Sequence, residues 1–130
     1  MKIAYLIGPM TPRGNRKDTD NAAIEYLLNV RDFLVAARAL IRKGYAPFCP
    51  GIDYSYFLNL QPGEVISEES IKAMSMAFLD VADLAVLLPG WEASPGSQAE
   101  YRRAVELKMP LFYGEGSVPD EGGVNDDQDY

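Results

Sequence analysis

The sequence predicts an α/β fold, a Rossmann-like three-layer sandwich with a four- to five-stranded parallel sheet. Short apolar runs alternate with longer amphipathic segments along the chain, and this alternation is typical of a parallel sheet with helices on both faces. One run, LAVLLP at residues 84–89, is apolar throughout, as a strand buried on both faces should be. The length of 130 residues is that of one ordinary domain.

The first part of the chain predicts a strand, a loop and a long helix. IAYLI at residues 3–7 is a short run rich in strand formers, and a Gly-Pro pair ends it. Residues 10–20 are polar without periodicity and are expected to form a loop. From residue 21 to residue 43, apolar side chains recur every three or four positions. This spacing predicts an amphipathic helix that ends at Gly44.

The remaining elements continue the alternation. YAPFCP at residues 45–50 predicts a second short strand. Residues 51–65, with three aromatic side chains, are expected to form a long irregular segment, a kind of loop that is often functional. Ser67 begins a second helix, which runs to about residue 82 and has acidic residues in its first turn. After the apolar third strand, residues 97–108 predict a third helix, and PLFY at residues 110–113 predicts the last strand.

Composition restricts the chemistry that the protein can perform. The chain has no histidine and one cysteine, Cys49, which excludes an intramolecular disulfide and a cysteine cluster for zinc or iron–sulfur. Acid–base work must fall to other side chains, and we expect no transition-metal site and no cofactor. The N-terminal apolar run is too short for a signal sequence or a membrane span. We therefore expect a cytoplasmic protein without a membrane partner.

The negative charge is concentrated at the C-terminus. The net charge is −7, and six acidic residues with no basic one follow residue 113. The rest of the chain is nearly neutral and has no basic stripe for duplex nucleic acid. The sequence thus predicts a folded domain over residues 1–114 and an acidic, disordered tail over residues 115–130.

Two loops are expected to meet at the carboxyl end of the sheet, where folds of this kind bind their ligands. GPMTPRGN follows the first strand, and PGWEASPGSQAE follows the third. The second loop places Glu100 in the first turn of the third helix, where the helix dipole lowers the pKa of a carboxyl group. Its spacing from Ser97 also fits a capping box. A helix cap and a nucleophile are therefore both open interpretations of Glu100.

The other candidates also have ordinary structural interpretations. Trp91 fits a packing residue, and Tyr5 fits a core tyrosine whose hydroxyl has a partner. Arg13 and Arg16 are either solvated loop charges or a grip on a phosphate or another anion. The sequence contains no P-loop and no Gly-x-Gly-x-x-Gly motif.

Taken together, several motifs resemble the nucleoside 2-deoxyribosyltransferase superfamily over residues 2–113. They are YLIGPM, the polar loop with Asn15, the long helix that ends at KGY, and ADLAVLLPGWEASPGSQAEYRRAVELKMPLFY. They look most like a small phage and bacterial branch with a Gly-Trp-Glu-x-Ser-x-Gly-x-x-x-Glu signature. The resemblance implies that Glu100 attacks the anomeric carbon of a nucleoside or nucleoside 5′-monophosphate and displaces the base. Water or a second base would then release the sugar.

The resemblance also implies roles for residues around Glu100. Tyr5 would hold and orient the nucleophile, and Ser94 would contact the sugar or a 5′-phosphate. The position of Trp91 in the loop, rather than any rule of the family, suggests that it walls the pocket. The substrate-binding residues expected in this way are Gly8, Pro9, Met10, Arg13, Asn15, Trp91, Ser94 and Gly96.

One position departs from the family pattern. Active members carry an aspartate that helps handle the leaving base, two helical turns before the Ala-Asp pair that precedes the third strand, and Ser75 occupies that place here. An N-glycosidase or 2-deoxyribosyltransferase and a non-catalytic nucleotide-binding protein are therefore both open. A third alternative is an interaction protein whose acidic tail is the working part. Because family members are dimers or larger, we also expect a homodimer or higher homo-oligomer.

Overall fold

A four-stranded parallel sheet forms the middle layer of the protein. The computed structural model describes residues 1–50 and 59–123. Within them the sheet has the order β2-β1-β3-β4, and all three pairings are parallel. The strands are β1 (Ile3–Ile7), β2 (Ala46–Phe48), β3 (Leu84–Leu87) and β4 (Leu111–Tyr113). The predicted α/β fold with at least four parallel strands is confirmed.

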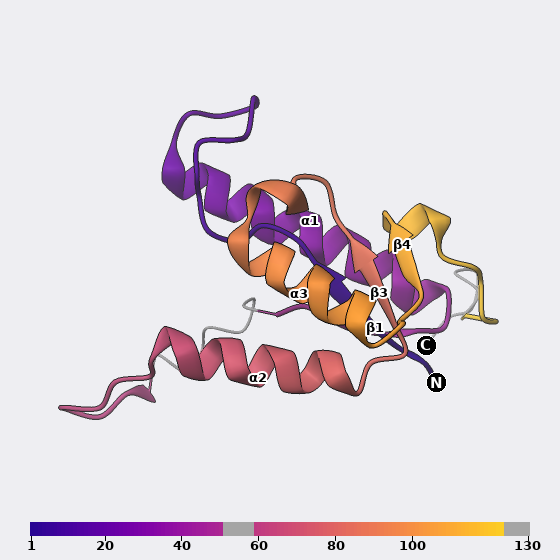
Figure 1. Ribbon diagram of the computed structural model, residues 1–130. Helices are drawn as coiled ribbons and strands as arrows, with labels where there is room; N and C mark the ends of the chain where they lie inside the picture. The colour runs from indigo at the N-terminus through magenta and orange to yellow at the C-terminus, as the bar shows by residue number, and fades with distance from the viewer. Residues whose placement is uncertain (51–58, 124–130) are drawn as a thin grey trace.

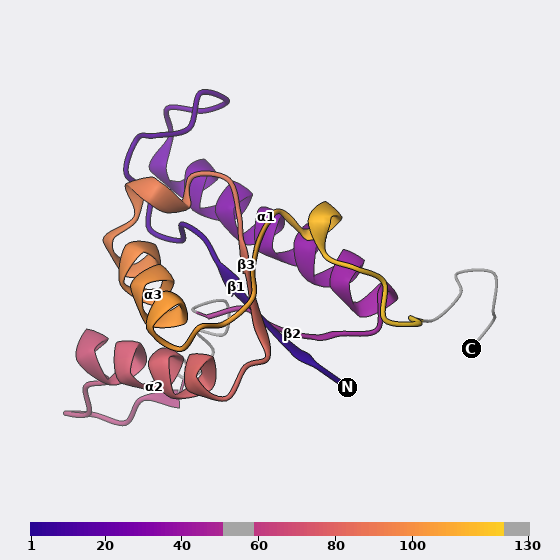
Figure 2. The same ribbon diagram turned by 45° about the vertical axis from the view of Figure 1, so that its right-hand side comes forward.

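Helices cover both faces of the sheet (Figures 1 and 2). The helix α1 (Ala22–Arg42) lies on one face, and α2 (Glu68–Asp80) and α3 (Pro95–Glu106) lie on the other. Side chains alternate along a strand, so β1 sends Leu6 into the core under α1 and Tyr5 into the core under α2 and α3. This division produces the three predicted layers, and it places Tyr5 on the same side as α3.

The core under α1 explains why the long helix forms where the sequence predicts it. Asn21 caps the helix, and its side chain accepts hydrogen bonds from the amides of Ala23 and Ile24. Phe33 and Leu40 face inward and are fully buried against the sheet. The chain leaves the helix through Gly44, whose φ of 95° belongs to the left-handed region that favours glycine.

The beginning of the predicted acidic tail is part of the fold. Residues 115–123 lie against the end of α1, with Val118 only 3% exposed. The Lys43 ammonium donates to three main-chain carbonyls of this segment, including that of Val118 at 2.7 Å. The Tyr45 hydroxyl donates to the carbonyl of Pro119 at 2.7 Å. Disorder was predicted from the acidic composition alone. Composition carries no information about donors such as Lys43 and Tyr45, which are distant in the sequence but contact this segment in the fold. Residues 124–130 lie outside the described residues.

The second helix begins where it was predicted to begin, at Ser67, which caps it with a hydroxyl that accepts from the amide of Ser70 at 3.1 Å. The long irregular segment with three aromatic side chains, predicted over residues 51–65, falls in large part outside the described residues.

Among the helices that the structure describes, none is long and apolar enough to cross a membrane.

Candidate active site

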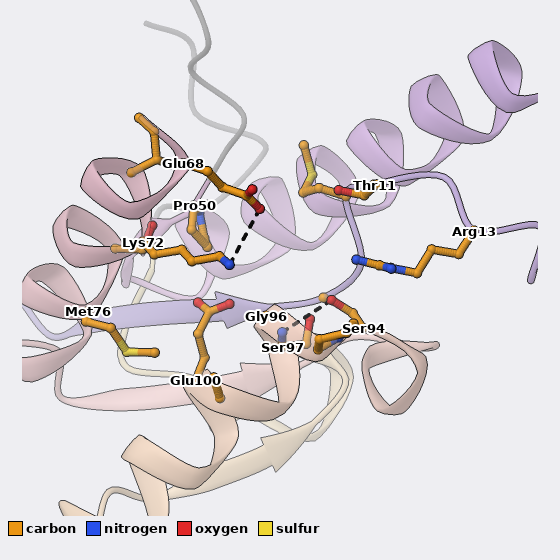
Figure 3. A pocket seen from close by; sticks show the side chains of 16 residues that line it. Thr11, Arg13, Pro50, Glu68, Lys72, Met76, Ser94, Gly96, Ser97 and Glu100 are labelled. Atoms are coloured by element: carbon orange, nitrogen blue, oxygen red, sulfur yellow. Dashed lines mark hydrogen bonds and ion pairs between the residues drawn. The ribbon is translucent and has the colours of Figure 1, made fainter. Parts of the chain in front are cut away.

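A cavity of about 300 Å³ opens beyond the carboxyl ends of β1 and β3 (Figure 3). One wall is the loop after β1, a second is the first part of α3, and a third is α2. The two loops that were expected to meet do meet here. The side chains that line the cavity include those of Met10, Arg13, Lys72, Ser75, Ser94, Ser97 and Glu100.

The helix α3 begins two residues earlier than predicted, at Pro95 instead of Ser97. Ser94 is its cap, and the Ser94 hydroxyl accepts from the amide of Ser97 at 3.2 Å. Pro95 occupies the first helical position, where its missing N–H costs nothing. Glu100 therefore lies in the second turn and not in the first. The interpretation of Ser97 and Glu100 as a capping box is wrong, because Ser97 is already inside the helix.

Burial dominates the electrostatics of Glu100. Its carboxyl group faces the cavity from the inner side of α3 (Figure 3). Loss of hydration raises the pKa of Glu100 from 4.5 to about 7, and the nearby Tyr5 hydroxyl opposes part of this rise. The predicted lowering of the pKa by the helix dipole is wrong, because that effect fades beyond the first turn while desolvation acts on the whole carboxyl group.

Tyr5 lies beneath the cavity floor with its hydroxyl beside Glu100. It has no exposed surface, and burial, followed by the charge of Glu100, raises the pKa of its phenol. The phenol therefore stays protonated and can act as a donor. Among the described residues, neither the Tyr5 hydroxyl nor Glu100 Oε2 has a hydrogen-bond partner of standard geometry. The two groups are close enough to shift each other's pKa, yet the Tyr5 hydroxyl can still donate a hydrogen bond and Glu100 Oε2 can still accept one.

A buried carboxylate on α1 holds the loop after β1 in place. Glu25 is 4% exposed, and its two oxygens accept from the amides of Arg13 at 2.6 Å and Gly14 at 3.1 Å. The Arg13 side chain points back toward the start of α3 at the edge of the cavity (Figure 3). Charge-assisted bonds of this kind are the strong ones, so the backbone of Arg13 is well anchored although its side chain is exposed.

Arg16 has a structural role instead of an anion-binding one. Its guanidinium pairs with Asp18 at 2.8 Å and with Asp32 at 2.7 Å, and it also donates to Asn29. These contacts tie the loop to α1. The interpretation of Arg16 as a grip on a free anion does not hold for this arrangement, because two carboxylates already occupy its donors.

The structure brings most of the predicted site residues together. Glu100, Gly8, Met10, Arg13, Ser94 and Gly96 all line the cavity. Pro9 and Asn15 instead line a neighbouring hollow of about 70 Å³ that shares Arg13 with the larger one. Trp91 lines neither, because its ring packs on Tyr101 with centroids 4.7 Å apart. The expected place of Trp91 in the pocket wall is therefore wrong, and its ordinary role as a packing residue is correct.

Comparison with known proteins assigns the chain to a family. The model of a family described as a domain of unknown function (DUF4406) matches residues 1–113. The chain belongs to this family. Among solved structures, the 2-desoxiribosyltransferase from Leishmania mexicana is similar at a TM-score of 0.50 and 18% sequence identity. The alignment covers 87% of this chain and 63% of that enzyme. No significant match is found among curated proteins.

The structural likeness confirms the fold that the motifs implied for this DUF4406 domain. At 18% identity the likeness concerns the fold alone, because one fold serves many functions. The activity, and the closer kinship to a phage and bacterial branch, stay predictions.

Sequence reasoning missed most of the α2 wall of the DUF4406 cavity. Glu68, Lys72 and Ser75 line it, and Lys72 Nζ lies 3.5 Å from Glu68 Oε1. Their spacing of four and three places them on one face of a helix, which was the available signal. In the sequence, Ser75 was notable only because it departs from the family pattern. The structure places it in the cavity wall next to the Tyr5 hydroxyl.

Proposed function

We propose that this DUF4406 protein cleaves the N-glycosidic bond of a nucleoside or nucleoside 5′-monophosphate, with Glu100 as the nucleophile. The supporting observation is the desolvated carboxyl group of Glu100 in the cavity wall, with the protonated Tyr5 phenol beside it. The cavity has the volume of a small-molecule site. Perturbed pKa values in such a cavity are a feature of catalytic groups.

The proposed reaction has two steps. In the first, a Glu100 oxygen forms a bond to the anomeric carbon while the bond from that carbon to the base nitrogen breaks. The base leaves with the bonding electrons and takes up a proton from solvent water. In the second, a water oxygen attacks the same carbon, the ester bond breaks, and Glu100 is regenerated as the water gives up a proton. A nitrogen of a second base can replace water, in which case the sugar is transferred.

The surroundings of Glu100 suit this role. A carboxylate with little hydration has less water to shed before it attacks, and its raised pKa makes it a stronger nucleophile once ionised. A hydrogen bond from Tyr5 to one carboxylate oxygen would leave the other free to face the sugar. Tyr5 is thus proposed as the residue that orients the nucleophile. We also propose that the protein is a homo-oligomer in the cytoplasm, that its substrate is a small molecule, and that it has no nucleic-acid partner.

The direct test is a search for released base. The purified protein is incubated with the common nucleosides and their 5′-monophosphates, ribo and deoxy, and free base is measured by chromatography. We expect release by the wild type and none by Glu100→Gln, while Glu92→Gln, which alters an exposed glutamate just before α3, retains activity. Mass spectrometry of the intact protein should detect the glycosyl ester during turnover. Undiminished release by Glu100→Gln would refute the assignment of the nucleophile.

Ser75 supports a second candidate, a non-catalytic nucleotide-binding protein. Ser75 lines the cavity, and the resemblance implies an aspartate at this position in active members of the superfamily. A serine hydroxyl is too weak an acid to protonate a leaving base. This candidate predicts that a nucleotide raises the melting temperature of the protein without any product. It also predicts that Ser75→Asp creates base release that the wild type lacks. Base release by the wild type would exclude it.

A further inference from the structure

The cavity contains few groups that can give a proton to a leaving base. When an N-glycosidic bond breaks, its electron pair moves to the base, so a proton donor beside the base lowers the barrier. Glu100 is not available for this task, because the proposed reaction uses its ionised form as the nucleophile. The donor must therefore be sought among the other side chains that line the cavity.

Among the described residues that line the cavity, elimination leaves Lys72 as the donor. The hydroxyl groups are too weakly acidic to protonate a base, and they belong to Thr11, Ser75, Ser94 and Ser97. The guanidinium of Arg13 does not release a proton in proteins. Glu68 pairs with the Lys72 ammonium at 3.5 Å as a carboxylate, which has no proton to give. Lys72 itself carries three N–H donors.

Lys72 and Glu100 come from different walls of the cavity. Lys72 belongs to α2 and Glu100 to α3, and both side chains point into the cavity (Figure 3). The base departs from the side of the anomeric carbon that is turned away from the nucleophile, so its proton has to come from a wall other than α3. Within the described part of the chain, Lys72 pairs with Glu68 and not with Glu100. The nucleophile therefore stays free to attack.

Glu68 holds the Lys72 ammonium near the cavity without fixing it tightly. It precedes Lys72 by four residues on α2, which is the favourable order for an ion pair on a helix. The Lys72 side chain is 63% exposed, and its flexible four-carbon stem can follow a base. An exposed pair of this kind contributes little to stability. Lys72 can therefore be replaced without loss of the fold.

We propose that Lys72 is the catalytic acid that protonates the leaving base and then the catalytic base that activates water. This inference rests on the proposed function, and it gives the path by which a proton of solvent water reaches the base. In the first step an N–H bond of the ammonium breaks, and the proton joins the base nitrogen that holds the departing electron pair. In the second step the neutral amine takes a proton from the attacking water while the ester bond breaks. The ammonium is restored, and the aspartate replaced by Ser75 is not required.

The test compares leaving groups that need a proton with one that does not. A nucleoside or its 5′-monophosphate releases a base that needs one, whereas the para-nitrophenyl glycoside of the same sugar releases a phenolate that is stable without one. Lys72→Met keeps most of the aliphatic stem and removes the ammonium. We expect it to lower kcat/KM for base release on the order of 100-fold or more and to have a much smaller effect on nitrophenol release.

Lys72→Arg separates proton transfer from charge. A guanidinium keeps the positive charge and the N–H donors but does not give up a proton, so this variant should be as impaired in base release as Lys72→Met. Full activity of Lys72→Arg would show that charge alone suffices and would overturn the inference. The control Lys17→Met removes an exposed cation outside the cavity lining and should leave kcat/KM unchanged. Equal melting temperatures will show that the variants fold.

The results separate this inference from the proposed function. If Lys72→Met releases base as fast as the wild type, or loses both leaving groups to the same extent, the role of Lys72 is overturned while the proposed function stands. If the wild type releases nitrophenol but no base, Glu100 is sustained as the nucleophile and the inference is overturned, because no group then protonates a base. If the wild type releases neither, the proposed function is overturned and the role of Lys72 with it.

Discussion

The raised pKa of Glu100 has a consequence for stability that can be measured without a substrate. In the unfolded chain this carboxyl ionises near its ordinary value of 4.5, whereas in the folded protein it ionises near 7. Between these values the folded protein keeps a proton that the unfolded chain has lost. The free energy of unfolding must therefore fall as the pH rises through this window. The penalty is absent below pH 4.5 and complete above pH 7.

The size of the effect follows from the shift. A rise from 4.5 to about 7, at 1.36 kcal/mol for each pKa unit, corresponds to roughly 3 kcal/mol. Glu100→Gln removes the ionisation and keeps the shape of the side chain. Relative to the wild type, the variant should gain roughly 3 kcal/mol of stability between pH 4 and pH 8, because only the wild type pays to bury a charge.

Urea denaturation of both proteins at several pH values provides the assay. The difference between their free energies of unfolding isolates Glu100, because the other titrating groups contribute alike to both. The control Glu92→Gln alters an exposed carboxylate and should show no comparable trend. A difference between wild type and Glu100→Gln that stays constant from pH 4 to pH 8 would show that Glu100 is not desolvated as the structure indicates.

Three further predictions concern activity, the loop and the C-terminal segment. If Glu100 is the nucleophile, kcat/KM should rise with pH and level off above about 7, because only the ionised form attacks; a profile that is flat from pH 5 to pH 8 would contradict this. Glu25→Gln replaces the acceptor of the Arg13 and Gly14 amides and should cost about 1–3 kcal/mol in urea unfolding. Hydrogen exchange at those two amides should accelerate in that variant, and unchanged exchange would show that the loop has another anchor. Lys43→Met keeps the aliphatic stem and removes the ammonium that holds residues 115–123; limited proteolysis should then cut this segment faster than in the wild type, and equal rates would show that Val118 burial alone suffices.

The fold was predictable because each element carries its own local signal. The continuous apolar run of β3 and the regular spacing in α1 both belong to short stretches of sequence, and both elements form where they were expected. The start of α3 was harder, since Ser94 and Ser97 can each cap a helix and stand three residues apart. Pro95 favours Ser94, because proline is common at the first helical position and a cap at Ser94 places Pro95 there.

The electrostatics of the site could not be predicted in the same way. The sequence places Glu100 near a helix N-terminus and so suggests a lowered pKa, but its hydration depends on Tyr5 and α2, which are distant in the chain. The same holds for Arg13 and Arg16, which look equivalent in the sequence. Only the position of Asp32 on α1 shows that one of them is paired.

Glu100 stands in the second turn of one rigid helix, so its position relative to Ser94, the cap of that helix, is set by backbone hydrogen bonds. No loop movement can change this separation. An insertion of one residue between the two positions would turn Glu100 by about 100° around the helix axis. The carboxyl group would then leave the cavity although every side chain that lines the cavity was still present.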